Sequence, residues 1–316
     1  MDDRTPPLPR FVIVGAQKSA TRWLRTNLGE HPDIFVPPSE VHFWNVAGRV
    51  KNEGLEWYRD QFDGWNGEPI VGEATPGYMI WRHHPEWVAT RMKRAMPDLK
   101  LIALLRNPID RASSALVHHI RRGRLPPDSR LVDVVRARRP PEKDRLCLVS
   151  GGWYAASLRP FLDTYGDSLL VLWQDDIGLD PTSVYESALA HVGASPDFRP
   201  EGLSKVIFSN RQDFGSAYVL TYEDRLELWE YFRDDVARLE KLLGVDLSRW
   251  EPRWDDPPAE PATIAPEPTT AVAAESVLVA AEPVVDEAEP RVGAADSPMD
   301  EAEPRTKWWS RRRTQA

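Results

Sequence analysis

The chain has 316 residues, 41% of them hydrophobic, and carries 40 Lys and Arg against 49 Asp and Glu. This length suits one large or two small domains and allows a sizeable core. The single cysteine, Cys147, excludes a disulfide scaffold. The first ten residues contain no apolar stretch, and the longest apolar runs fall far short of the roughly 20 residues that span a bilayer. We therefore expect a soluble, cytoplasmic protein.

The formal net charge of −9 is unevenly distributed. Residues 251–304 carry 14 acidic and 2 basic side chains together with 10 of the 29 prolines, whereas residues 305–316 carry five basic side chains and no acidic ones. Such a Pro-rich acidic segment cannot bury enough apolar surface to offset the entropy lost on ordering. We predict one domain over 1–254 and a disordered tail over 255–316. The domain itself is nearly neutral, so a few placed cations suffice to bind an anion.

The tail ends in KWWSRRRTQA, which pairs Trp308 and Trp309 with arginines 311–313. Such a segment can contact an anionic membrane surface or a partner protein. The alternative is a free terminus whose arginines are only hydrated. No nucleic-acid partner is expected.

The first structural pattern is an apolar, β-branched run over Phe11–Val14, followed by the loop Gly15–Ser19 and a helical segment that ends at Gly29. The short run is typical of a buried strand. Ser19 is suited to cap the following helix and Gly29 to end it. The order is therefore strand, loop, helix.

A second unit of the same kind begins with the continuous apolar run Leu99–Leu105. Such runs are typical of parallel strands covered on both faces. Asn107 is a good helix N-cap, Pro108 fits the first helical position, and Gly123 closes the helix.

A third strand is predicted over Ser168–Trp173, after a helical stretch over Tyr154–Tyr165. One further helix is predicted from Thr221 to Leu243, because Thr221 and Asp224 have capping-box spacing and an apolar stripe follows. Alternating strands and helices predict an α/β fold: a single-domain three-layer sandwich with a central parallel sheet.

The loop after the first strand has the features of an anion site. A helix N-terminus favours an anion, and Lys18 adds a full positive charge. The loop is not a Walker A motif, because Gly15 precedes Lys18 by only three residues and Gln17 replaces the second glycine. A lysine at a helix start is common, so this pattern alone leaves a purely structural role open.

The second unit supplies another candidate anion site. Arg106 follows the second strand, and Ser114 lies about two turns into the next helix. Ligands bind where the carboxyl ends of parallel strands meet. Two cationic sites on neighbouring strands suit a nucleotide with phosphates at both ends of its ribose.

Together these motifs resemble the sulfotransferases that use 3′-phosphoadenosine 5′-phosphosulfate (PAPS), in particular the heparan-sulfate type and its bacterial relatives. The resemblance covers nearly all of 11–250 and implies a fold like that of the P-loop NTPases. The segments that carry it are VGAQKSATRWL (14–24), PSEVHFWN (38–45), GEATPGYM (72–79), LLRNPIDRASSAL (104–116) and GGWYAASLRPFLDTYG (151–166).

The resemblance implies a role for each matching residue. Arg106 and Ser114 match the pair that holds the 3′-phosphate. Glu40 matches the acidic residue that takes the proton of the acceptor hydroxyl, and His42 is the alternative base. The residues that match the binding site of the 5′-phosphosulfate are Lys18, Ser19, Ala20, Thr21 and Arg22.

Three positions depart from the family pattern. Ala20 replaces a loop glycine, which is tolerable if the residue is in a right-handed helical conformation. Ser39 replaces the lysine that precedes the glutamate at position 40 in the heparan-sulfate enzymes. Ala74 replaces the lysine that follows their glutamate at position 73. The two missing cations put a heparin-like acceptor in doubt.

The implied reaction is in-line sulfuryl transfer from PAPS, which leaves 3′-phosphoadenosine 5′-phosphate. A sulfuryl group carries less charge than a phosphoryl group, so Lys18 and helix N–H groups can stabilise it without a metal, and none is expected. Two alternatives are a phosphate-loop nucleotide kinase and a non-catalytic PAPS-binding scaffold.

The acceptor is the least defined part of the function. A hydroxyl of a carbohydrate, a glycolipid or a small metabolite is expected, because the region between the two nucleotide motifs is rich in aromatic and polar side chains. For each of these side chains, packing in the core is the competing explanation. They are Trp44, Trp57, Tyr58, Trp65, Tyr78, Trp81, His83 and His84.

Overall fold

The computed structural model describes residues 5–138, 144–204 and 220–254, and its centre is a five-stranded parallel sheet. The strand order is β2-β3-β1-β4-β5, so β1 occupies the middle. Ile13 of β1 lies opposite Ala74 of β3 on one side and Ile102 of β4 on the other. The strands are β1 (Phe11–Gly15), β2 (Ile34–Phe35), β3 (Ile70–Ala74), β4 (Lys100–Leu105) and β5 (Leu169–Trp173).

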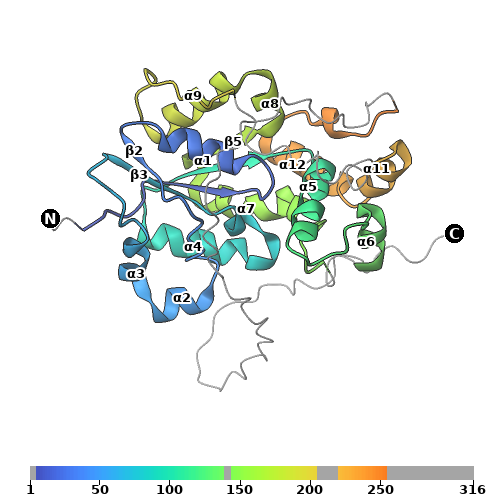
Figure 1. Ribbon diagram of the computed structural model, residues 1–316, viewed down its shortest axis with the longest axis horizontal. Helices are drawn as coiled ribbons and strands as arrows, with labels where there is room; N and C mark the ends of the chain where they lie inside the picture. The colour runs from blue at the N-terminus through green and yellow to red at the C-terminus, as the bar shows by residue number, and fades with distance from the viewer. Residues whose placement is uncertain (1–4, 139–143, 205–219, 255–316) are drawn as a thin grey trace. The chain divides into compact units, whose positions relative to one another are not determined.

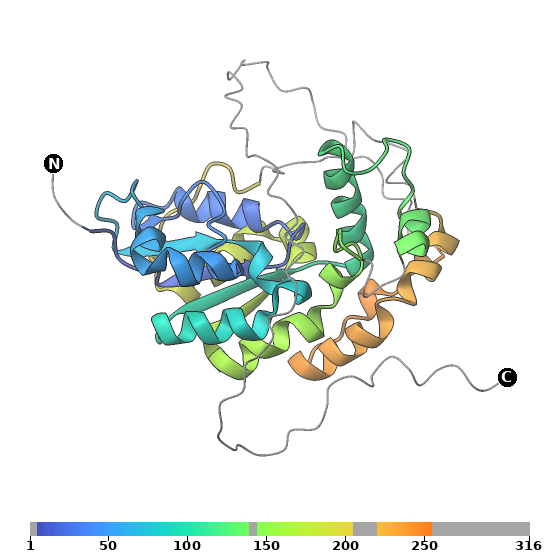
Figure 2. The same ribbon diagram turned by 90° about the horizontal axis from the view of Figure 1, so that it is seen from below.

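Helices cover both faces of this sheet (Figures 1 and 2). One layer contains α1 (Thr21–Gly29) and α9 (Pro181–Val192), and the other contains α4 (Pro85–Ala95) and α7 (Tyr154–Tyr165). The remaining helices are α2 (Ala47–Asn52), α3 (Gly54–Asp60), α5 (Pro108–Arg121), α6 (Leu131–Arg138), α8 (Gln174–Leu179), α11 (Tyr222–Trp229) and α12 (Arg233–Leu243).

The two faces of the sheet carry separate cores. Along β1, Phe11 and Ile13 pack against the α1 and α9 layer, whereas Val12 and Val14 pack against the other layer. Alternation along a strand sends successive side chains to opposite faces, and all four are fully buried because both faces are covered. The predicted α/β three-layer fold is confirmed.

Most of the predicted elements are found. The strands predicted from residues 11, 99 and 168 are β1, β4 and β5, and the helix over Tyr154–Tyr165 has the predicted bounds. The Asn107 side chain caps α5 by accepting hydrogen bonds from the N–H groups of Ile109 and Asp110. The sequence analysis did not identify β2 and β3, the two strands at one side of the sheet.

Two predictions about helices are wrong. Ser19 does not cap α1: the N-cap position is Ala20, and no side chain hydrogen-bonds there. The single helix predicted over residues 221–243 is two helices, α11 and α12, although the Thr221 and Asp224 capping box is present. The helix is interrupted at residues 230–232. There Phe232 is fully buried close to Gly152, and the carbonyl of Tyr231 accepts a hydrogen bond from the Trp153 indole.

The proposed tail over 255–316 lies outside the described residues, as do residues 1–4, so the domain boundary at 254 stays a prediction. Within the described ranges, no helix is both long enough and apolar enough to cross a membrane.

Asp235 of α12 holds the start of α7. Its carboxylate accepts hydrogen bonds from the N–H groups of Ala155, at 2.8 Å, and Ala156, at 3.4 Å. No residue preceding α7 caps it with a side chain, so this contact from a distant helix takes the place of a local cap.

We predict that Asp235→Ala lowers the free energy of unfolding by about 2 kcal/mol, because the buried N–H group of Ala155 and the partly buried one of Ala156 lose their acceptor. Urea denaturation measures the change. Asp234→Ala is the control, since Asp234 is exposed and should change stability by less than about 0.5 kcal/mol. Equal effects of the two substitutions would contradict the assigned cap.

Candidate functional site

The loop between β1 and α1 carries the first group of predicted site residues. The Ala16 N–H donates to the Leu104 carbonyl at 2.8 Å, which fastens the loop to β4. Lys18 and Ala20 both have positive φ, 69° and 62°. This backbone leaves the N-terminus of α1 without a side-chain cap, and the first turn of the helix contains no acidic residue. The helix N-terminus is thus suited to an anion.

The conformation of Ala20 differs from the expected one. We expected a right-handed helical residue, whereas Ala20 is left-handed, with φ 62° and ψ 18°. In that region a Cβ lies too close to the following carbonyl, at a cost of roughly 1–2 kcal/mol for a residue other than glycine. Glycine adopts this conformation without that cost, and here the chain accommodates the methyl group of Ala20.

Ser19, in the loop between β1 and α1, is completely buried. Its hydroxyl oxygen has no hydrogen-bond partner within the described residues. This hydroxyl neither caps α1 nor has a hydrogen-bond partner among the described residues. It can therefore donate a hydrogen bond to an anion at the helix N-terminus.

The charge state of Lys18 is set by its surroundings. Burial lowers the pKa of its amine to about 8, and the guanidinium groups of Arg111, Arg122 and Arg121 act in the same direction. The carboxylate of Glu40 opposes them. A bound anion would supply the negative charge that this lysine lacks and would raise its pKa again.

Arg106 lies beside this loop. Its guanidinium Nη1 donates to the Lys18 carbonyl at 3.3 Å, and its Nε is buried with no partner among the described residues. Asn107 anchors the following turn, because its Nδ2 donates to the carbonyl of the buried Trp250. The fold therefore brings the two predicted cations, Lys18 and Arg106, together. Ser114 is half-buried on α5, two turns beyond Arg106.

Glu40 and His42 form a pair. The His42 Nε2 lies 3.0 Å from the Glu40 Oε2, and its Nδ1 faces the Asn45 amide nitrogen at 3.4 Å. With Nδ1 accepting from Asn45, Nε2 carries the proton and donates it to Glu40. His42 thus orients the carboxylate that the sequence analysis selected as the base.

The backbone that carries Glu40 and His42 is held by side chains at the end of β3. The Thr75 hydroxyl accepts hydrogen bonds from the N–H groups of Val41, at 3.0 Å, and His42, at 3.4 Å. The Tyr78 hydroxyl accepts one from Phe43 at 3.2 Å. These contacts hold His42 at φ 54°, a conformation that a histidine rarely adopts unaided.

Glu73, fully buried behind this segment, was not singled out in the sequence analysis. Burial raises the pKa of its carboxyl to about 7, and the hydroxyls of Tyr78, Tyr58 and Thr75 offset only part of that rise. The signal in the sequence was a glutamate within the unidentified strand Ile70–Ala74, whose other residues are small or apolar. Without that strand, nothing indicated that this glutamate is buried.

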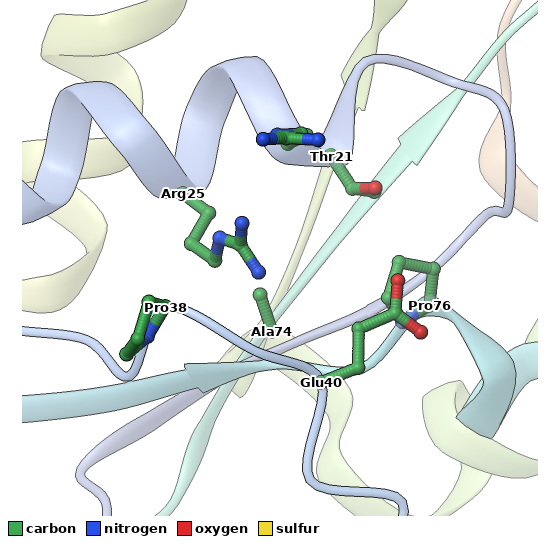
Figure 3. A pocket seen from close by; sticks show the side chains of 7 residues that line it. Thr21, Arg25, Pro38, Glu40, Ala74 and Pro76 are labelled. Atoms are coloured by element: carbon green, nitrogen blue, oxygen red, sulfur yellow. The ribbon is translucent and has the colours of Figure 1, made fainter. Parts of the chain in front are cut away.

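A cavity of about 240 Å³ lies between α1 and the Glu40 segment. Figure 3 shows Thr21 and Arg25 on the helix side, Glu40 on the opposite side and Ala74 between them. Of the predicted site residues, the cavity brings together Thr21, Arg22 and Glu40. Its lining consists of Thr21, Arg22, Arg25, Pro38, Glu40, Ala74 and Pro76.

Besides Arg22 and Glu40, the cavity is lined by a third charged residue, Arg25, which was not among the predicted site residues. It lies one turn after Arg22, and the helical periodicity of α1 was the available signal, because residues three apart share a face. Among the described residues, no group of three or more His, Cys, Asp or Glu side chains is placed to hold a metal ion.

We predict that Glu73→Gln removes a pH dependence of stability. A carboxyl whose pKa is raised to about 7 in the folded protein binds more protons there than in the unfolded chain. Stability therefore falls as the pH rises from the unfolded pKa near 4.5 through 7. Urea denaturation should show the variant gaining about 2 to 3 kcal/mol on the wild type between pH 5 and pH 8.

Glu53→Gln, an exposed substitution at the end of α2, is the matched control and should follow the wild-type curve. Parallel curves for wild type and Glu73→Gln would show that Glu73 is ionised in the folded protein throughout this range.

The sulfotransferase domain family matches residues 8–163. The crystal structure of a sulfotransferase from Alicyclobacillus acidocaldarius is 32% identical, has a TM-score of 0.64, and aligns over 77% of this chain and 99% of that one.

Two curated relatives act on heparan sulfate by name. The human heparan sulfate glucosamine 3-O-sulfotransferase 3A1 is 35% identical over 114 residues, 36% of this chain and 26% of that protein. The mouse bifunctional heparan sulfate N-deacetylase/N-sulfotransferase 4 is 28% identical over 284 residues, 77% of this chain and 31% of that protein. The matches therefore span about a quarter to a third of the curated relatives' length.

Proposed function

This chain belongs to the sulfotransferase family, and on that premise we propose that it moves a sulfuryl group from PAPS to a hydroxyl of a carbohydrate-containing acceptor. The observation that carries the proposal is the shared cavity. Thr21 and Arg22, from the anion-binding end of α1, line it together with Glu40. A group bound at the helix N-terminus and a hydroxyl beside Glu40 would meet there.

The donor site is proposed to use two sets of residues. The 5′-phosphosulfate would bind the uncapped N-terminus of α1, with Lys18 and Ser19 before the helix and Thr21 and Arg22 in its first turn. The 3′-phosphate would bind Arg106 and Ser114. The buried, unpaired Ser19 hydroxyl and Arg106 Nε fit such a ligand, since each needs a partner that the described part of the chain does not provide.

Glu40 is the proposed general base. Its carboxylate would accept the proton of the acceptor hydroxyl as the oxygen forms its bond to sulfur and the bond to the 5′-phosphate breaks. Lys18 would stabilise the negative charge that develops on the leaving phosphate oxygen. His42 would keep the carboxylate oriented through the 3.0 Å contact, and Thr75 would keep the backbone beneath it in place.

The carbohydrate acceptor is supported by the curated relatives, whose names give heparan sulfate as their substrate. Ser39 and Ala74, which replace two lysines of that type, count against an identical substrate. Family membership disfavours the nucleotide kinase, and we expect sulfuryl transfer to continue in the presence of a chelator.

The experiment that tests the function uses PAPS labelled in its sulfuryl group and a panel of oligosaccharide and glycolipid acceptors. We predict that Glu40→Gln lowers kcat by ~10²-fold or more while the affinity for 3′-phosphoadenosine 5′-phosphate stays nearly unchanged, because general-base help is worth ~10²–10⁴-fold. Lys18→Ala should lower both, since a charge-assisted contact contributes ~1.5–3 kcal/mol to binding.

The outcome shows which residue acts as the general base and which one binds the donor. A near-normal kcat in Glu40→Gln with an inactive His42→Ala would assign the base to His42. Normal turnover in both variants would exclude this segment as the source of the base. A wild type that binds the donor product but transfers to no acceptor in the panel would favour the scaffold alternative.

A further prediction concerns the protonation of Lys18. Its pKa of about 8 means that half of the free protein carries an uncharged amine at pH 8. An anionic ligand draws a proton to this amine, so affinity for 3′-phosphoadenosine 5′-phosphate should fall as the pH rises above 8. Calorimetry at pH 8 in buffers of different ionisation enthalpy should show uptake of about half a proton per ligand bound.

Lys18→Arg is the matched variant, because arginine stays charged throughout this range. It should bind the same ligand with no uptake of a proton at pH 8. Equal uptake by wild type and Lys18→Arg would assign the proton to another group.

A further inference from the structure

Arg25 occupies a position in the cavity that the proposed transfer does not use. It lies on α1 three residues after Arg22, one helical turn further from the loop that carries Lys18. Figure 3 shows its side chain extending from the helix towards Ala74, on the same side of the cavity as Pro38. Its guanidinium therefore lies in the part of the cavity near Pro38 and Ala74, one helical turn away from the loop that carries Lys18.

The guanidinium of Arg25 is partly removed from water and is not neutralised. Burial lowers its pKa, the neighbouring Arg22 lowers it further, and only Glu40 acts in the opposite direction. No described residue accepts a hydrogen bond from it or forms an ion pair with it within 4.0 Å. A desolvated cation without a partner is costly, unless a ligand supplies the missing anion.

The charges of the cavity favour an anionic group at this point. Two arginines face a single carboxylate, Glu40, which must remain free to accept a proton. Arg22 lies in the first turn of α1, beside the donor's proposed position. Arg25 is thus the cation left for the other reactant.

The size and shape of the cavity limit what this anion can be. At about 240 Å³ the cavity is smaller than the about 300–1,000 Å³ typical of ligand pockets, so only the reacting end of an acceptor fits. The small side chain of Ala74 leaves space beneath the guanidinium. A planar guanidinium binds carboxylates and sulfate esters through two parallel hydrogen bonds.

We propose that Arg25 is a specificity-determining residue, which binds a carboxylate or sulfate ester close to the acceptor's reacting hydroxyl. This inference rests on the proposed sulfuryl transfer and deepens it. The acceptor class is a sugar that already carries a negative charge. A residue of α1 binds this charged group, in place of the two lysines that Ser39 and Ala74 replace.

The test compares two oligosaccharides that differ only in charge. One contains glucuronate, and the other is the same oligosaccharide with its carboxylates reduced to hydroxymethyl groups. We expect wild type to have a kcat/KM about 10-fold or more higher for the charged one, as the loss of a charged hydrogen bond predicts. In Arg25→Gln this ratio should fall towards one, mainly through a higher KM for the charged oligosaccharide.

Two further variants sharpen the comparison. Arg25→Lys keeps the charge without the paired hydrogen bonds and should retain part of the preference. Arg94→Gln removes one positive charge from an exposed position on α4 and should retain all of it, which controls for the net charge of the protein. Thermal unfolding of each variant checks that the fold is intact.

Calorimetry with 3′-phosphoadenosine 5′-phosphate separates this inference from the proposed function. Unchanged affinity in Arg25→Gln together with a lost preference supports the assignment to the acceptor. A weakened affinity would assign Arg25 to the donor and overturn the inference, as would equal kcat/KM values in wild type or a preference that survives in Arg25→Gln. Transfer to neither oligosaccharide overturns it too, whereas a wild type that fails to bind the nucleotide contradicts the proposed function itself.

Discussion

The site depends on the parallel pairing of β1 with β3 on one side and β4 on the other. With Ile13 opposite both Ala74 and Ile102, three strands end at one edge of the sheet, and the segments after them are forced together. The Lys18 loop follows β1, Thr75 and Tyr78 follow β3, and Arg106 follows β4. The contacts between Ala16 and Leu104 and between Arg106 and Lys18 are direct consequences. No local sequence pattern contains these contacts, since each joins residues about 90 positions apart.

This convergence explains how a chain of negative net charge can bring cationic side chains together in a candidate anion site. The acidic excess lies after residue 250, while Lys18, Arg22 and Arg106 gather at one sheet edge. The position of Lys18 has a cost, because burial, together with Arg111, Arg122 and Arg121, lowers the pKa of its amine to about 8. A bound anion would reverse that effect. The cost in the free protein is what makes the site responsive to an anion.

The sequence predicted those parts that local rules determine. The apolar runs of β1 and β4, the Asn107 cap and the Thr221 capping box follow from residue type and spacing, and all are found. The parts it missed depend on distant contacts. β2 has only two residues, β3 contains a buried glutamate, and the break near Phe232 depends on the surface that Gly152 and Trp153 present. The candidate site shows the same division. Motif matching predicted Lys18 and Glu40 as site residues, whereas only the three-dimensional structure shows that Arg25 lines the cavity and that Glu73 is buried in the core.

Glu40 and Glu73 show why residue type alone does not define a catalytic group. Both lie close to His42, yet Glu40 is at the cavity surface with 40% of its side chain exposed, and Glu73 is completely buried. A base must exchange its proton with a reactant, which Glu73 cannot reach through the packed side chains above it. With its pKa raised to about 7, Glu73 is mostly neutral below that pH, and it lies near Thr75 and Tyr78, whose hydroxyls hold the backbone of residues 41–43. The exposed glutamate is therefore suited to proton transfer, and the buried one to support of the loop that carries it.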